Sequence, residues 1–366
     1  MNCYDYANRI DRFLMAVGHF NSQNSAPSIV MCRGYYKNFQ IVALDYANGK
    51  LTKRWHFDTY PDYQDYVEQG NHNLAVGDVD GDGKDEIIYG ACAIDHNGKG
   101  LYSTGLGHGD ALHLGKFDPT REGLQVVTCH ESPSKYGNNG LEMHDAATGE
   151  IIFGVSGDGD DIGRCMVADV DPETPGCEVW ASGTTLDGKL YSCKGELLSK
   201  KAPVYKFAGS WTFNMGIWWN GTLNRQMLDR GYVTEYIADN GGSGNRIFFK
   251  EDYGVTTAQG TKNNPVFYGD FWGDWREEMI YVTPDYTELR IFTTNIETKY
   301  RFRPLMYDHV YRLSATHENV GYNQPTHPGF YIGSDLLKDE NMEIGPGGIG
   351  DWKPEEGEHN GSAYED

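Results

Sequence analysis

The sequence has no long apolar run. None of its 366 residues belongs to a stretch of about 18 consecutive apolar residues, which a membrane-spanning helix needs. The opening MNCYDYANRIDRFL also lacks the basic segment and following apolar segment of a secretory signal. The sequence therefore predicts neither a membrane span nor a signal peptide.

Paired cysteines and positive charge are also scarce. The seven cysteines, from Cys3 to Cys193, are odd in number and include no C-x-x-C pair, which argues against a disulfide scaffold and a zinc site. We expect most of them to be buried. With 31 Lys and Arg against 53 Asp and Glu, the formal net charge is -22, which argues against nucleic acids and anionic membranes as partners. Divalent cations are the natural counter-charge.

Helical periodicity is almost absent, whereas short apolar segments and turn residues are frequent. The 46 glycines and 25 tyrosines suit many short strands joined by tight turns, and 39% hydrophobic residues can form a large core. One pattern recurs, in which a short apolar strand is followed by a polar or acidic turn and a second apolar strand. The copies are FLMAVGHFNSQNSAPSIVMC from Phe13, NLAVGDVDGDGKDEIIYG from Asn73, ALHLGKFDPTREGLQVVTC from Ala111, RCMVADVDPETPGCEVWAS from Arg164, the divergent MGIWWNGTLNRQMLD from Met215 and NPVFYGDFWGDWREEMIYV from Asn264.

The spacing of these copies predicts a β-propeller. Their turns recur at intervals close to the roughly 40 to 50 residues of a four-stranded blade, and a β-sandwich would not restart the same turn chemistry at that interval. We expect about six blades within residues 1–336, with segment 303–333 ending the last copy, and further blades upstream because a ring must close its edges. Residues 337–366 form an acidic, Gly-rich tail that we expect to be disordered.

One turn carries the spacing of a cation loop. Asp78, Asp80 and Asp82 occupy positions one, three and five, the Lys84 carbonyl occupies position seven, and Glu86 occupies position nine. Alternating oxygens of this kind can surround one hard cation, and calcium fits better than magnesium because magnesium demands a strict octahedron. The alternative is a solvated acidic turn.

Two further turns keep part of this pattern. One offers Asp270, Asp274 and Glu278, with intervening carbonyls, and the other offers Asp169, Asp171 and Glu178 with one extra residue. The first copy has His19 and Asn21 instead, and we expect hydrogen bonds there. Losing cations from the acidic turns should loosen the blades, because the packed carboxylates would then repel one another.

Residues just before each repeat should converge, because the innermost strands of all blades begin at the same face of a propeller. His72, His108 and Asp110, with Glu131 from the following segment, could form a mixed nitrogen and oxygen metal site there. Because histidine is unusual for calcium, manganese and zinc stay open as alternatives, as does a purely structural role. Arg164, Lys262 and Asn263 precede later copies, and Arg164 and Lys262 add positive charge to the same mouth.

Several longer segments resemble one enzyme family. They are NRIDRFL, QGNHNLAVGDVDGDGKDEIIYG, DHNGKGLYSTGLGHGDALH, HDAATGEII, GDWREE, LRIFTT and HENVGYNQPTH, which together span about Asn8 to Gly333. They are similar to polysaccharide lyase family eleven, the rhamnogalacturonan lyases. The resemblance implies an eight-bladed all-β propeller with several bound calcium ions. It also implies β-elimination at the rhamnose–galacturonate linkage of rhamnogalacturonan I, a pectic polysaccharide.

The resemblance also implies roles for particular residues. His72, His108, Asp110 and Glu131 belong to the calcium cluster of the cleft, and Arg164 with the Gly260–Thr261–Lys262 run lines the substrate path. Gln259 stands where the family has asparagine, and Asn263 completes the substrate-contacting set. By analogy with the family we expect a monomer that works outside the cytoplasm, in the extracellular space, at the cell surface or in the periplasm.

Elimination needs a base for the C5 proton and neutralisation of the uronate carboxylate. We predict Lys262 as the base, because a guanidinium hardly ever deprotonates, and Arg164 as the carboxylate clamp. Two alternatives stay open. One is a non-catalytic, calcium-stabilised propeller for carbohydrate binding or adhesion, and the other is an inactive lyase fragment. A glycoside hydrolase is disfavoured because no pair of carboxylates stands apart from the cation turns.

Overall fold

The computed structural model describes residues 13–206, 209–258, 262–322 and 324–336, and these residues are almost entirely strands and turns. Five four-stranded antiparallel sheets, one three-stranded sheet and one two-stranded hairpin are found in this part of the chain. Each large sheet is built from consecutive strands, as in the blades of a propeller. The predicted all-β propeller with about six blades is confirmed.

The first three blades contain twelve strands. These are β1 (Phe13–Gly18), β2 (Ser28–Arg33), β3 (Gln40–Ala47) and β4 (Lys50–Asp58); β5 (Ala75–Gly77), β6 (Glu86–Ile88), β7 (Cys92–Ile94) and β8 (Gly100–Ser103); β9 (Leu112–Gly115), β10 (Gln125–Cys129), β11 (Asn139–Asp145) and β12 (Ile151–Ser156).

The remaining three blades and the hairpin contain thirteen strands. These are β13 (Cys165–Ala168), β14 (Glu178–Ala181), β15 (Lys189–Ser192) and β16 (Leu197–Lys201); the hairpin β17 (Val204–Tyr205) and β18 (Ser210–Trp211); β19 (Gly216–Ile217), β20 (Gln226–Asp229), β21 (Tyr232–Thr234) and β22 (Arg246–Phe249); β23 (Phe267–Gly269), β24 (Glu278–Val282) and β25 (Leu289–Phe292).

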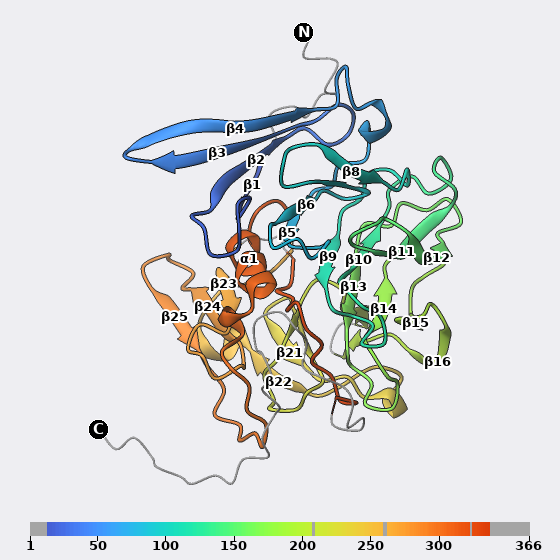
Figure 1. The fold of residues 1–366 in the computed structure, drawn as a ribbon. Helices are drawn as coiled ribbons and strands as arrows, with labels where there is room; N and C mark the ends of the chain where they lie inside the picture. The colour runs from blue at the N-terminus through green and yellow to red at the C-terminus, as the bar shows by residue number, and fades with distance from the viewer. Residues whose placement is uncertain (1–12, 207–208, 259–261, 323, 337–366) are drawn as a thin grey trace.

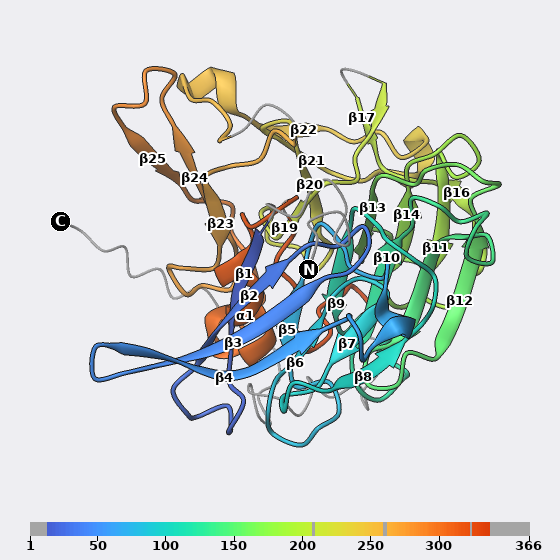
Figure 2. The same cartoon turned by 90° about the horizontal axis from the view of Figure 1, so that it is seen from above.

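The repeated sequence pattern coincides with the first two strands of each blade. The small residue before the turn is the last residue of β1, β5, β9, β13 and β23. Seen from above, blades β5–β8, β9–β12, β13–β16, β19–β22 and β23–β25 follow one another in an arc (Figure 2). The β1–β4 sheet packs one face against the second blade, where Val30, Ile41 and Phe57 join Ile87 and Ile94 in one buried cluster.

A helix lies where the sequence predicted the end of the last copy. Segment 303–333 contributes no blade strand among its described residues and instead contains α1 (His309–His317). The helix contacts β1 and β5 and bridges the second and sixth blades (Figure 1). His309 lies 2.7 Å from Asp85, and the Tyr311 hydroxyl donates to Glu277 at 2.7 Å. The predicted strand copy is therefore wrong here, and the helix fills the space between blades.

Short 3-10 turns occur at Gln64–Tyr66, Ala238–Asn240, Lys250–Tyr253 and Leu305–Tyr307. The six cysteines in the described part are buried and form no disulfide, as predicted. No helix in these segments has the length and apolarity needed to cross a membrane. The predicted tail, residues 337–366, lies outside the described residues.

Candidate metal centre and catalytic residues

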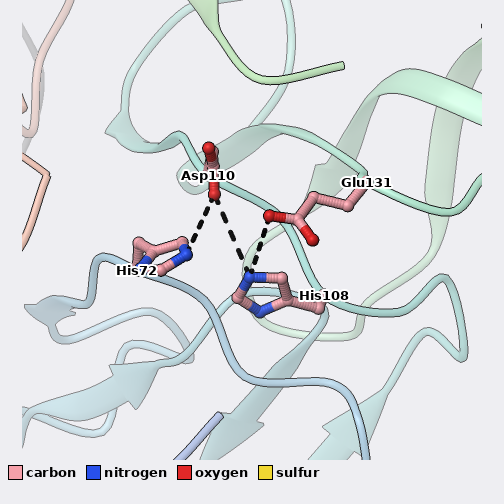
Figure 3. A group of neighbouring side chains, drawn as sticks. All are labelled: His72, His108, Asp110 and Glu131. Atoms are coloured by element: carbon pink, nitrogen blue, oxygen red, sulfur yellow. Dashed lines mark ion pairs between the residues drawn. The ribbon is translucent and has the colours of Figure 1, made fainter. Parts of the chain in front are cut away.

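Four predicted ligands meet where three loops converge. His72 precedes β5, His108 and Asp110 lie between β8 and β9, and Glu131 follows β10. One ligand atom from each residue lies within 4.8 Å of the others. Asp110 Oδ1 lies 3.2 Å from His72 Nε2 and 3.9 Å from His108 Nε2, and Glu131 Oε1 lies 3.5 Å from His108 Nε2 (Figure 3). The predicted convergence is confirmed.

Backbone hydrogen bonds hold these loops together. The His72 N–H donates to the Gly109 carbonyl at 3.2 Å, and the Glu131 N–H donates to the His108 carbonyl at 3.0 Å. Gly109 fits because a Cβ there would lie 1.8 Å from the Cys129 carbonyl oxygen. The glycine between two ligands therefore lets the loop lie directly against the end of β10.

The hydrogen bonds of His108 aim its ligand nitrogen into the cluster. Nδ1 lies 2.5 Å from the Gly70 carbonyl, which can only accept, so Nδ1 carries the proton. Nε2 then presents a lone pair toward Asp110 and Glu131. A second-nitrogen bond of this kind orients most histidines that bind metals.

The four residues fit a divalent cation. Within the described segments, His108 Nε2 and Asp110 Oδ1 are buried without a hydrogen-bond partner, an arrangement that costs free energy unless a ligand satisfies them. Burial, with the charge of Glu131, raises the pKa of Asp110 to about 7. Two carboxylates and two imidazoles suit calcium supplemented by water, and also manganese or zinc.

Lys262 and Arg164 lie beside this cluster. The Arg164 guanidinium donates to the carbonyls of Asp110 and Tyr322 at 3.5 and 3.4 Å. The Lys262 ammonium lies 4.5 Å from the centre of the Tyr322 ring. Burial and the charge of Arg164 lower the pKa of Lys262, and burial lowers the pKa of Arg164. The structure thus gathers both predicted catalytic residues next to the predicted metal ligands.

Aromatic residues that the sequence analysis did not identify border the cluster. Tyr322 stacks on His72 with ring centres 4.1 Å apart, and the Tyr36 hydroxyl lies 3.1 Å from His72 Nε2. Tyr35 stacks on His108 at 5.2 Å. Tyr322 lies in the segment HENVGYNQPTH, which carried the family resemblance, whereas Tyr35 and Tyr36 had no local signal.

The predicted substrate run is only partly described. Gln259, Gly260 and Thr261 lie outside the described residues, so their roles stay predictions. Asn263 follows Lys262 with φ 55°. It is half-buried in the same loop as the candidate base.

The turn between β5 and β6 supports the first predicted cation loop. Asp78, Asp80 and Glu86 place three oxygens within 4.8 Å of one another, and Asp82, Glu86 and His96 form an overlapping group. Burial, with added charge from Asp80 and Asp78, raises the pKa of Glu86 to about 8. The Lys84 ammonium lies 2.7 Å from Asp82, and the Lys84 carbonyl stays a predicted ligand.

The turn between β13 and β14 is arranged differently. Asp171 is paired with the Lys200 ammonium at 2.7 Å, and Asp169 accepts from Asn224 at 2.6 Å. No three ligand atoms of Asp169, Asp171 and Glu178 lie within 4.8 Å of one another in the structure as described. A cation in this turn stays a prediction. The Lys200 ammonium already supplies part of the positive charge that offsets these carboxylates.

The turn between β23 and β24 also gathers no such group among the described side chains. Asp274 pairs with Arg276 at 2.5 Å, and Asp270 accepts from the Gly273 N–H at 2.8 Å. Burial raises the pKa of Asp270 to about 6 and that of Glu278 to about 7. Cation binding by Asp270, Asp274 and Glu278 therefore stays a prediction. The first copy uses hydrogen bonds as expected, with His19 N–H donating to Asp85 at 2.6 Å.

One side chain at or next to the start of the second strand caps the turn in five blades. It accepts hydrogen bonds from backbone N–H groups of the turn, and the five residues are Glu86, Gln125, Glu178, Gln226 and Glu278. The two glutamine amides also donate to the carbonyl two positions earlier, at 3.0 and 2.7 Å.

A carboxylate cannot make that second bond because it has no proton to donate. In the described part of the chain, Oε1 of Glu86 and of Glu178 has no hydrogen-bond partner. The glutamine turns are therefore complete on their own, whereas the Glu86 and Glu178 turns keep an oxygen available for a cation.

Comparisons with known proteins agree with this architecture. The model of rhamnogalacturonan lyase family 11, C-terminal domain, matches residues 3–342. Rhamnogalacturonan endolyase YesW of Bacillus subtilis (strain 168) is 46% identical over 334 residues, which are 91% of this chain and 51% of that protein. Rhamnogalacturonan exolyase YesX of the same organism is 46% identical over 346 residues, 91% of this chain and 54% of that protein.

Solved structures give the same result. The crystal structure of YesW matches with a TM-score of 0.82 and 44% identity, over 93% of this chain and 54% of that one. The Bacillus licheniformis rhamnogalacturonan lyase PL11 matches with a TM-score of 0.83 and 45% identity, over 94% of this chain and 55% of that one. The chain spans about half the length of these relatives. Because the family model matches all of the described residues, the chain belongs to rhamnogalacturonan lyase family 11.

Proposed function

We propose that this chain carries the catalytic centre of a rhamnogalacturonan lyase that cleaves the rhamnose–galacturonate linkage of rhamnogalacturonan I by calcium-dependent β-elimination. One observation carries the proposal. The His72, His108, Asp110 and Glu131 cluster lies beside Lys262 and Arg164, in a chain 46% identical to a rhamnogalacturonan endolyase and a rhamnogalacturonan exolyase.

The residues divide the chemistry between them. Lys262 removes the proton from C5 of the galacturonate, because burial and Arg164 lower its pKa and so increase its neutral fraction. Arg164 holds the uronate carboxylate with a guanidinium that also donates to the carbonyls of Asp110, Tyr322 and Asn214 at 3.4 to 3.5 Å. A cation bound by His72, His108, Asp110 and Glu131 would neutralise the uronate charge.

The substrate is a polyanion, and the chain has a formal net charge of -22. Without bound cations the acidic surface would repel a pectic chain. The buried Arg164 and half-buried Lys262 form a local positive patch, so the substrate is drawn to this mouth once cations offset the neighbouring carboxylates. A pectic substrate also places the protein's work outside the cytoplasm.

The test is incubation of the purified chain with rhamnogalacturonan I, with calcium or with a chelator, while the absorbance of the unsaturated uronate product is followed. We expect product only with calcium. Product formation that persists in chelator would show that the reaction does not require calcium. A folded chain that binds rhamnogalacturonan I without releasing product favours the binding propeller, or a lyase fragment that needs the remaining length of its relatives.

A further inference from the structure

A polar network with a buried carboxylate and two buried histidines lies behind the metal cluster and has no part in the proposed chemistry. Glu142 and His144 face inward from β11, and the Glu142 carboxylate lies 3.0 Å from His144 Nδ1. The Tyr102 hydroxyl lies 3.2 Å from His144 Nε2. His130 Nε2 lies 3.5 Å from Glu142 Oε1, an ion-pair distance without hydrogen-bond geometry among the described residues. Burying a carboxylate is costly unless it is paired, so a network of this kind calls for an explanation.

His130 connects this network to two metal ligands. Its Nδ1 lies 2.9 Å from the Gly107 carbonyl, which can only accept, so Nδ1 donates there. Gly107 directly precedes His108. His130 is also the residue before Glu131, whose N–H donates to the His108 carbonyl at 3.0 Å. The His130 side chain therefore holds the loop before His108, and the N–H of the next residue, Glu131, holds the same loop at His108.

The backbone of His130 is fixed as well. Its N–H donates to Gly140 at 3.0 Å and its carbonyl accepts from Ile162 at 3.2 Å. On the opposite side, the Gly107 N–H donates to Gln69 Oε1 at 2.9 Å. The loop that carries His108 is thus held between Gln69 and His130, and only the His130 side leads on to a buried charged group.

We propose that His130 is a positioning residue for the metal cluster, and that Glu142, braced by His144, fixes the His130 ring so that His108 and Glu131 keep their ligand spacing. The inference rests on the proposed function, because it assumes that the cluster binds calcium. Groups that hold metal ligands in place are commonly worth about 10- to 100-fold in metal affinity. Without His130, the Gly107 carbonyl loses its donor and the two loops can separate.

The experiment is calcium titration by calorimetry on the whole chain and on variants. The heat of calcium binding that is lost in His72→Ala is the heat that belongs to the cluster. We expect His130→Ala to weaken that same site by about 10- to 100-fold and to leave the remaining calcium heats unchanged. His130→Asn should recover most of the affinity, because its amide nitrogen can replace Nδ1 as the donor to Gly107. On the His72→Ala background, His130→Ala should change the isotherm no further.

His113→Asn is the matched control. His113 is a buried imidazole of β9 that pairs with His327 at 3.0 Å, outside this network, so its loss should lower the melting temperature without weakening the cluster site. If His130→Ala does not fold, Glu142→Gln replaces it in the experiment. We expect this variant to lose less calcium affinity. Unchanged calcium affinity in folded His130 variants overturns the positioning role and leaves the lyase proposal standing. An unchanged isotherm in His72→Ala shows that the cluster binds no calcium and overturns both.

Discussion

Lys262 lies in an environment unlike that of an ordinary exposed lysine. It is half-buried, lies 4.5 Å from the centre of the Tyr322 ring, and has its pKa lowered by burial and by Arg164. An exposed lysine is almost fully protonated at neutral pH and cannot accept a proton. Desolvation and a neighbouring positive charge both favour the neutral amine, and that is the form a general base requires.

We therefore expect Lys262→Ala to lower the rate of product formation by about 10²- to 10⁴-fold, the usual contribution of a general base. Lys262→Arg should not restore the rate, because a guanidinium keeps its proton. The measurement is the absorbance of the unsaturated product, with calcium titration and thermal unfolding as checks that the site and the fold persist.

Lys116→Ala is the control for this experiment. Burial also lowers the pKa of Lys116, but its ammonium donates to the carbonyls of Arg121 and Gly123 in a turn. Its loss should leave turnover unchanged. Full turnover in Lys262→Ala would exclude Lys262 as the base.

Among residues, the sequence predicted those whose position in a repeat decides their place. His72, His108 and Asp110 precede first strands, so the repeat alone brought them to one mouth. Tyr36 and Tyr322 could not be predicted in this way, because each reaches His72 through contacts between distant segments. No pattern of residues in the repeat marks the position of either tyrosine.

At the scale of elements, the strands and turns were predicted because their signals are local. The small residue that ends the first strand and the polar turn behind it recur within a few positions. Helix α1 was missed because it is nine residues long and has buried residues around most of its circumference, at His309, Val310, Tyr311, Leu313, Ala315 and His317. Such a helix shows no apolar stripe, so periodicity does not reveal it.

We propose that the capping residue of a turn influences whether the turn binds a cation. Gln125 satisfies both its own amide and a turn carbonyl, whereas Glu86 keeps a buried oxygen without a hydrogen-bond partner in the described structure. We expect Glu86→Gln to raise the melting temperature in chelator at neutral pH. The amide needs neither a buried charge next to Asp78 and Asp80 nor the proton that the Glu86 carboxyl takes up on folding because its pKa is raised to about 8. The rise that calcium produces should become smaller in the same variant.

Thermal unfolding with and without calcium measures both effects. The reciprocal change Gln125→Glu is the control, since it removes a donor and adds a buried charge and so should destabilise the chain in chelator. If calcium raises the melting temperature equally in Glu86→Gln and in the parent chain, Glu86 does not bind the cation that stabilises the fold.

For the whole molecule, several acidic side chains are buried close to other carboxylates. Burial is the main cause of each shift, and it raises the pKa of Glu86 to about 8 and those of Asp110 and Glu278 to about 7. Ordinary values are 4.5 for glutamate and 3.8 for aspartate. Without cations, the folded chain therefore holds protons that the unfolded chain releases.

The sign of the pH dependence follows from these shifts. A group whose folded pKa is raised contributes stability that is fully present below its unfolded value and is lost as the pH rises through its folded value. In chelator, this contribution should be lost between about pH 4 and pH 8, the range set by the ordinary and raised values. Calcium takes the place of the lost protons, so the stabilisation by calcium should increase over the same range.

We therefore expect the difference in melting temperature between calcium and chelator to be small near the acidic end of this range and largest near its upper end. Each unit of pKa difference corresponds to about 1.4 kcal/mol, so even one such carboxylate should change the melting temperature by about 2 °C or more. Magnesium in place of calcium is the control, and it should give a smaller effect because it resists dehydration. A calcium effect that does not vary with pH would mean that stabilising cations bind away from these buried carboxylates, since protons would then not compete with them.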